Sequence, residues 1–228
     1  MAWGEVRGGR SLDRLIGFSD AVVAVAVTIL ALPLVDIEGP QNGETMWDVL
    51  VAHAGQIQTF FITFLVVAIL WNVHNRIVNS LAYFDTAIFY LVVLWLMGFV
   101  FLPWPSTLYT AAGFDPEEAM SHDVSGAGVL YWMTLAYIAF IGALTARHMD
   151  RHPELIAADS VAYMAALHAS RARYRGLAFT TTFVIAAIAT YFVYWLGNYF
   201  LLLLIPISIY LRPPRHDPEQ AAPEGDAG

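Results

Sequence analysis

Long apolar stretches alternate with short polar segments along the 228 residues of this chain. A helix needs about 20 apolar residues to cross roughly 30 Å of hydrocarbon, and the first five stretches are long enough. A sixth, shorter stretch follows the turn signal Gly197-Asn198. The stretches lie at about 15–35, 56–74, 82–104, 127–146, 177–196 and 198–211. The pattern predicts an all-α membrane protein with six transmembrane helices, the last two forming a hairpin.

Composition supports this fold class. Hydrophobic residues make up 58% of the chain and charged residues 13%, whereas an ordinary soluble domain is about 25% charged. Residues 1–212 are therefore predicted to form one transmembrane domain, and the Pro-, Ala- and acid-rich residues 213–228 are predicted to be disordered. The first apolar stretch is span-length and lacks a small-residue cleavage site, so no cleavable signal peptide is expected.

The basic residues of the chain indicate its orientation. All 11 are arginines, and six spans would place every one of them on the same side of the membrane. They are Arg7, Arg10, Arg14, Arg76, Arg147, Arg151, Arg171, Arg173, Arg175, Arg212 and Arg215. The opposite loops, about 36–55 and 105–126, contain acidic residues and no arginine. By the positive-inside rule, both termini are expected to be cytoplasmic in a multi-pass protein of the cell membrane.

Several functional classes lack their usual residues in this sequence. A net charge of −8 gives no basic face for a nucleic acid, and the absence of cysteine removes thiolate chemistry. The sequence contains no T-V-G-Y-G potassium filter, H-E-x-x-H motif, phosphate-binding loop or intramembrane aspartate pair. We therefore expect neither an enzyme nor a cofactor, metal site or nucleic-acid partner.

The segment between the fourth and fifth spans combines polar residues with spaced apolar ones. Pro153 stands at an expected helix start, since proline suits the first position of a helix. The apolar positions are Leu155, Ile156, Met164 and Leu167. This pattern predicts an interfacial or cytoplasmic amphipathic helix within residues 149–175.

Two spans carry polar side chains near the arginine-bearing side. Arg14, Ser19 and Asp20 stand near the start of the first span. In one interpretation, Ser19 or Asp20 caps a helix start at the interface and Arg14 snorkels to the lipid headgroups. In the other, these side chains face protein or water. Trp71, His74 and Asn75 share one helical face at the end of the second span, at a similar depth to Asp20. The six side chains are therefore a candidate polar cluster.

The first span also presents an apolar stripe. Residues at spacings of three and four share one face, and Thr28 lies beside it. The stripe consists of Phe18, Val22, Val25, Ile29 and Leu32. From spacing alone, a stripe of this kind is usually core or lipid-facing surface.

The string Arg14-x-x-x-Phe18-Ser19-Asp20, followed by an apolar helix with Thr28, resembles the signature of the transmembrane protein 175 family. Animal members are endolysosomal potassium channels, and shorter bacterial and archaeal relatives exist. Trp71-x-x-His74 and Leu102-Pro103 also match, and the resemblance covers essentially the whole chain. The motif occurs once, at 14–20, so the chain resembles the single-repeat prokaryotic type, which is a homotetramer in the plasma membrane.

The resemblance implies that the first span lines a pore with a hydrophobic constriction in place of a carbonyl filter. Val25 matches the narrow ring, Ile29 and Leu32 lie further along, and Thr28 matches a threonine layer tied to potassium preference. Relatives often have isoleucine at the narrow ring, and valine is one methylene smaller.

The resemblance also implies a polar packing network. Arg14, Phe18, Ser19 and Asp20 would pack the first span against the second and third. Relatives commonly have an asparagine within the third span about where this chain has Val92, which implies a smaller network here.

The expected function is a potassium-preferring cation channel formed by four copies in a lipid bilayer, with monovalent cations passing through it. The outer loops, which are acidic and contain no arginine or lysine, would concentrate cations at its mouth. The alternative is a proton-coupled secondary transporter or a structural membrane protein that uses Arg14, Asp20 and His74. Transporters commonly contain inverted repeats, and none is found in this sequence.

Overall fold

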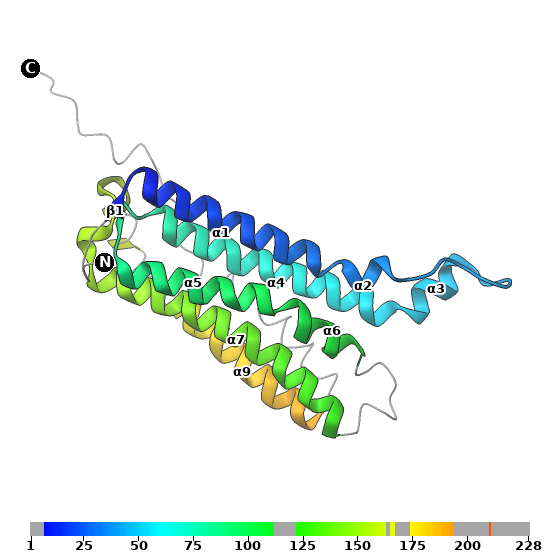
Figure 1. Cartoon of the computed structure of the whole chain (residues 1–228). Helices are drawn as coiled ribbons and strands as arrows, with labels where there is room; N and C mark the ends of the chain where they lie inside the picture. Colours follow the sequence, from blue (N-terminus) through cyan, green and yellow to red (C-terminus); the bar gives the residue numbers. More distant parts are fainter. Residues whose placement is uncertain (1–6, 112–121, 163–164, 167–173, 194–209, 211–228) are drawn as a thin grey trace, which may run out of the picture.

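The computed structural model describes residues 7–111, 122–162, 165–166, 174–193 and 210. Long helices run side by side between two ends of an elongated bundle (Figure 1). The long helices are α1 (Arg10–Ile29), α4 (Ala54–Asn79), α5 (Thr86–Phe101), α7 (His122–Arg151) and α9 (Arg175–Phe192). Within the described residues, 5 helical segments are long and apolar enough to cross a membrane. They correspond to the first five predicted spans, and they make this a multi-pass membrane protein.

Two sequence predictions lie outside the described residues. The predicted sixth span, about 198–211, is described only at Tyr210, and residues 213–228 are not described.

The first span consists of two helical pieces. Helix α1 ends at Ile29, and α2 (Leu32–Val35) follows after a break at Leu30 and Ala31. Pro33 lies in the first turn of α2 and has no N–H. It therefore cannot donate the helical hydrogen bond that the Ile29 carbonyl, four residues earlier, would otherwise accept. The Ala31 N–H instead donates to the Thr28 carbonyl at 3.1 Å. The proline therefore accounts for the break.

Side-chain caps define the starts of two other helices. Helix α3 (Met46–Ala52) begins with a capping box between Thr45 and Asp48. At α5, the Asp85 side chain accepts a hydrogen bond from the Ile88 N–H at 2.8 Å. In Figure 1, α2, α3 and the chain between them extend beyond the main bundle.

The third span also consists of two pieces. Helix α5 ends at Phe101, and α6 (Pro103–Ala111) begins after Leu102. Proline is tolerated there because the first residues of a helix have no intrahelical partner for their N–H groups. The helical path therefore continues past the predicted end at 104.

The core lies between α5, α7 and α9. Its largest fully buried side chains include the aromatic residues Trp95, Trp132, Tyr131, Phe99 and Phe183. Small residues let α7 and α9 approach closely: a Cβ atom added at Gly176 would lie 2.7 Å from the Cβ of Ala143. Helix α1 joins this core with one face, through Leu12, Leu15, Val23 and Ala26, and packs mainly on α4 and α5.

A network of short backbone pairings closes the end of the bundle at which α1 begins. Strand β1 (Arg7–Gly8) pairs antiparallel with β2 (Tyr83–Phe84). The Ala82 N–H donates to the Leu155 carbonyl at 2.9 Å, and the Ala157 N–H donates to the Ser80 carbonyl at 3.0 Å. The start of α1, the approach to α5 and the segment after α7 are therefore joined.

This network corrects only the expected start of the amphipathic helix at Pro153, because residues 161–162 and 165–166, further along the predicted segment, are helical. Helix α7 continues to Arg151, and two short 3-10 turns follow, η2 (Pro153–Leu155) and η3 (Ala158–Ser160). Leu155 is only 2% exposed, because it packs into the core. The other two apolar positions, Met164 and Leu167, lie outside the described residues.

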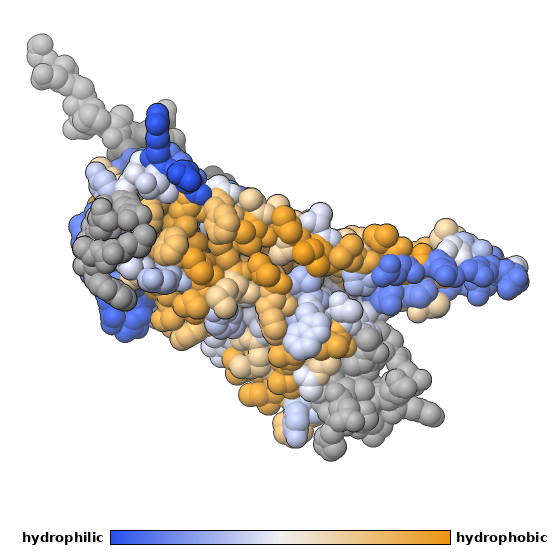
Figure 2. All heavy atoms as spheres, in the orientation of Figure 1, coloured by the Kyte–Doolittle hydropathy of each residue, from blue (hydrophilic) through white to orange (hydrophobic). Residues whose placement is uncertain are grey.

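The described arginines share this end of the bundle. They lie in β1, at the start of α1, the end of α4, the end of α7 and the start of α9, namely Arg7, Arg10, Arg14, Arg76, Arg147, Arg151 and Arg175. Figure 2 shows an apolar band over the helices, with hydrophilic surface at both ends. We call the end with these seven residues the arginine-rich end.

Candidate functional site

Helix α1 has one face that packs within the chain and one that does not. Five of its residues are buried: Leu12, Leu15, Ser19, Val23 and Ala26. The opposite side of α1, continued by Leu32 of α2, contains the residues expected to line a pore, and all four are exposed in the single chain. The exposed fractions are 58% for Val25, 41% for Ile29 and 56% for Leu32, and Thr28 is also exposed. Within the described residues, no other helix covers these four side chains.

The hydroxyl group of Thr28 is oriented by its own helix. Thr28 Oγ1 lies 2.9 Å from the Ala24 carbonyl oxygen and 2.8 Å from the Val25 carbonyl oxygen, to which it donates. A hydroxyl has one proton and two acceptor lone pairs, so the lone pairs remain available on the exposed side. The hydroxyl oxygen is therefore suited to coordinate a cation.

One hydrogen bond links the polar residues of the first and second spans. The Trp71 indole N–H donates to Asp20 Oδ1 at 2.9 Å. Ser19 is buried and donates to the Leu15 carbonyl of its own helix at 2.8 Å. Asp20 therefore faces α4, as the candidate cluster requires, whereas the Ser19 hydroxyl stays within α1.

His74 occupies a different environment from Asp20. Its ring stacks on the Trp95 ring of α5, with centroids 3.7 Å apart and an interplanar angle of 11°. Neither ring nitrogen has a hydrogen-bond partner within the described part of the chain. Asn75 accepts a hydrogen bond from Asn79, one turn further along α4.

The remaining predicted network residues point away from the bundle. Arg14 and Phe18 are both exposed in the single chain. Among the candidate network residues that the structure describes, the only hydrogen bond between two of them joins Trp71 to Asp20. Val92, where relatives commonly have asparagine, is fully buried.

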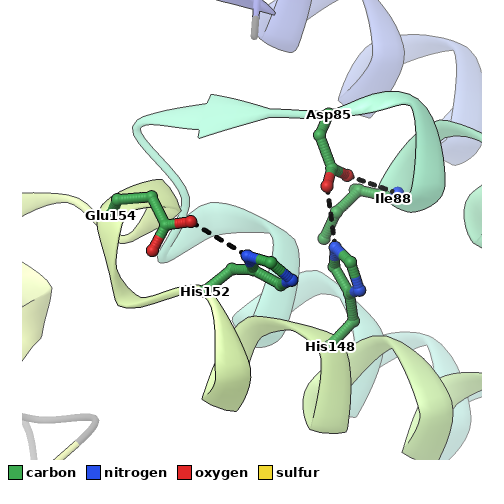
Figure 3. Close-up of polar contacts among 5 residues, drawn as sticks. All are labelled: Asp85, Ile88, His148, His152 and Glu154. Atoms are coloured by element: carbon green, nitrogen blue, oxygen red, sulfur yellow. Dashed lines mark hydrogen bonds and ion pairs between the residues drawn. The ribbon is translucent and has the colours of Figure 1, made fainter. Parts of the chain in front are cut away.

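A second polar cluster was not predicted as a site. His148 Nε2 lies 2.8 Å from Asp85 Oδ2, and His152 Nδ1 lies 2.9 Å from Glu154 Oε1 (Figure 3). The sequence signal was present, because two histidines four residues apart share a helical face. Their carboxylate partners come from a distant residue and from the turn after α7, which periodicity cannot identify. In the described residues, no group of three or more side chains is arranged to hold a metal ion.

Comparison with known proteins finds a family that part of the chain resembles. Residues 14–103 match the family model described as endosomal/lysosomal potassium channel TMEM175. The chain is therefore similar to the TMEM175 family over this segment. The matched segment runs from Arg14 to Pro103 and so contains every residue predicted above for the pore and the polar network, whereas His148, His152 and Glu154 lie beyond it.

Individual TMEM175 relatives match parts of the chain. A potassium channel of Streptomyces collinus is 32% identical over 136 residues, which is 58% of this chain and 64% of that protein. A potassium channel of Chamaesiphon minutus is 29% identical over 61% of this chain and 71% of its own length. The mouse endosomal/lysosomal proton channel TMEM175 is 27% identical over 44% of this chain, but only 20% of the mouse protein is covered. The chain thus spans less than two thirds of some curated relatives. These relatives are channels rather than enzymes, in agreement with the sequence analysis.

A solved structure supports the fold. The crystal structure of a lysosomal potassium-selective channel TMEM175 homologue from Chamaesiphon minutus aligns with a TM-score of 0.68. The alignment covers 90% of this chain and 100% of the other, at 22% sequence identity. The helical arrangement described above is therefore the fold of a TMEM175 homologue.

Proposed function

We propose that four copies of this chain surround a pore lined by α1 and form a potassium-preferring cation channel of the prokaryotic cell membrane. The observation that carries the proposal is the exposed stripe of Val25, Thr28, Ile29 and Leu32, which the part of the chain that the structure describes leaves uncovered. It lies in the segment that matches the family model. The partners are three further copies of the chain, the bilayer and monovalent cations. No cofactor is required, and the permeant ion is K⁺.

The physical mechanism follows from the chemistry of the stripe. A ring of four Val25 side chains would strip water from an ion, and a hydrophobic constriction can gate by dewetting. Thr28 is one turn away, so its hydroxyl oxygens can replace part of the lost hydration. Acidic side chains beyond α2 attract cations toward the entrance. They include Asp36, Glu38, Glu44 and Asp48, and all four are exposed.

The test is a conductance measurement under potassium/sodium bi-ionic conditions with purified protein in liposomes. A shorter side chain at the constriction leaves room for water, so Val25→Ala should raise conductance and let sodium compete. Val100→Ala on α5 is the matched control, because Val100 is also exposed, at 62%. Val23 is unsuitable, since it is 5% exposed and its truncation would disturb packing. Equal effects of Val25→Ala and Val100→Ala on reversal potential and conductance would place the pore elsewhere.

The same preparation separates the channel from its alternatives. Single-channel steps support the proposal, whereas saturable, proton-coupled flux without steps would favour a secondary transporter. The absence of any flux would favour a structural membrane protein.

Proton conduction is a second candidate function. The observation that favours it is the name of the mouse and zebrafish relatives, endosomal/lysosomal proton channel TMEM175. A pH-sensitive dye inside the liposomes should report proton entry when a potassium gradient sets the voltage. A stable internal pH during a measurable potassium current would exclude it.

A further inference from the structure

Four titratable side chains form a row at the arginine-rich end. Asp85 precedes α5, His148 lies in the last turn of α7, His152 directly follows that helix, and Glu154 lies in η2. The two carboxylate–imidazole contacts of 2.8 and 2.9 Å flank a pair of imidazole rings whose centroids are 4.4 Å apart. Figure 3 shows the order Glu154, His152, His148, Asp85, with each carboxylate against its own histidine.

Both carboxylates are held in the ionised form. Partial burial acts to raise the pKa of Asp85, but the hydrogen bonds from the Ile88 N–H and from His148, with the nearby imidazoles, lower it overall. The backbone N–H of Glu154 and its contact with His152 lower the pKa of Glu154. The carboxylates therefore stay negative while histidine side chains change charge, which ordinarily happens between pH 5 and 8.

Other charged and titratable groups surround the row. The last turns of α7 also carry Arg147, Asp150 and Arg151, all exposed. Tyr83 belongs to β2, and Tyr174 and Arg175 lie where α9 begins beside α7. The charged residues of β1 and of the first turns of α1 are Arg7, Arg10, Asp13 and Arg14. The charges of His148 and His152 act through space to lower the pKa of Asp85. The charge of His152 lowers the pKa of Glu154, and the charge of Asp85 raises it.

The row is mechanically connected to the helix that carries the proposed pore face. Asp85 directly follows β2, in which Phe84 pairs with Arg7 of β1. Arg7 lies three residues before Arg10, where α1 begins. The segment that contains Glu154 is tied to the same loop, because the Leu155 carbonyl accepts from the Ala82 N–H. A change in the contact between Asp85 and His148 therefore acts on the anchor of α1.

We propose that Asp85, His148, His152 and Glu154 form a proton-binding site whose occupation clamps the end of α7 to the β1–β2 anchor of α1. With both histidines neutral, the row carries two negative charges and its contacts are ordinary hydrogen bonds. Protonation of His148 converts its contact with Asp85 into an ion pair, which is the stronger kind of hydrogen bond.

Positive charges on both imidazoles would repel each other, because the ring centroids are 4.4 Å apart. Glu154 offsets part of this repulsion from the far end of the row, through its contact with His152. The two flanking carboxylates therefore allow the row to hold the positive charge that closes the clamp.

The test is hydrogen–deuterium exchange of the backbone amides of residues 80–84 in the full-length protein, at pH 7.5 and pH 5.5. Glutamine can replace a neutral imidazole as a hydrogen-bonding group but cannot become charged, so His148→Gln isolates the ion pair. At pH 7.5 the wild type and His148→Gln should exchange at similar rates. At pH 5.5 the wild type should exchange about two- to fivefold more slowly than the variant, as expected for a partly exposed ion pair.

The matched control is His53→Gln at the opposite end of the bundle, where His53 also contacts an oxygen, that of Gln56. It should exchange like the wild type at both pH values. A ratio of wild-type to His148→Gln rates that is the same at both pH values overturns the proposal, and so does an equal response of His53→Gln.

A second variant keeps the test decisive if His148→Gln does not fold. Asp85→Asn retains a cap for α5 but cannot form an ion pair, so it should lose the same protection at pH 5.5. Unchanged protection in Asp85→Asn would overturn the proposal. Exchange does not require conduction, so this result is independent of whether the chain forms a channel.

Discussion

Asp20 and Arg14 belong to the same short motif, yet they have different surroundings in the single chain. Asp20 accepts the Trp71 indole N–H, whereas Arg14 is exposed and has no hydrogen bond or ion pair with the described residues. Both side chains lie at the arginine-rich end of α1, where an uncompensated charge near the bilayer is costly. In the proposed tetramer, a neighbouring copy of the chain is the available source of a partner for Arg14.

We therefore expect Arg14→Ala and Asp20→Asn to impair assembly more than permeation. Asp20 lies about 140° around the helix from Val25, at roughly 100° per residue, so it does not face the proposed pore. Size-exclusion chromatography should show loss of the tetramer. A tetrameric profile combined with collapsed potassium selectivity would contradict this assignment.

Thr28 makes a separate prediction at the scale of one residue. Thr28→Val removes the hydroxyl oxygen and keeps the shape, so the potassium/sodium preference should fall while assembly is unchanged. Thr28→Ser keeps the hydroxyl and should retain most of the preference. Reversal potentials under bi-ionic conditions measure both. A serine variant as unselective as the valine variant would exclude the hydroxyl as the cause.

Which residues share a face could be predicted from the sequence, but their contacts could not. The spacing of Val25, Ile29 and Leu32 fixes one face of α1, and the structure leaves that face uncovered. The stacking of His74 on Trp95 depends on how α4 and α5 rotate against each other. Helical periodicity within one segment contains no information about that rotation.

At the scale of elements, spans were predictable and their interruptions were less so. Length and hydropathy identified the five described spans, because bilayer thickness imposes a simple requirement. The break after Ile29 follows from Pro33, whereas the hydropathy pattern predicts one continuous span over about 15–35. The turns at 153–160 depend on pairing with the loop at 80–82, and local sequence favoured a helix there.

The packing of α7 against α9 supports a prediction at this scale. Gly176→Ala would place a methyl group against Ala143, so we expect a loss of about 1–3 kcal/mol from overpacking. The thermal unfolding midpoint in detergent should fall by several degrees, at about 2–4 °C per kcal/mol. Gly126→Ala on α7 is the control, since a Cβ there meets open space. An equal midpoint shift in both variants would contradict close packing at Gly176.

The whole molecule is an elongated bundle whose α1 packs on one side only. One copy of α1 cannot enclose a path through the membrane, so a pore requires several copies. A heterologous interface whose rotation closes produces a ring, which is the symmetry that a central pore needs. The uncovered stripe on α1 is the surface available for this arrangement.

We expect native mass measurement in mild detergent to give four copies of the chain. Chemical crosslinking should saturate at the same number. A monomer or dimer that still conducts ions after reconstitution would contradict the closed fourfold ring.

The break in the first span has an electrostatic consequence for the ring. Helix α1 ends at Ile29, so its carbonyl groups are directed toward α2 and the acidic loop beyond it. Aligned peptide dipoles give this terminus roughly half a negative elementary charge, and four such termini together supply about two. In the proposed ring, the backbone itself would repel anions that approach from that side. Discrimination against chloride should therefore persist even when the carboxylates of the loop are neutralised.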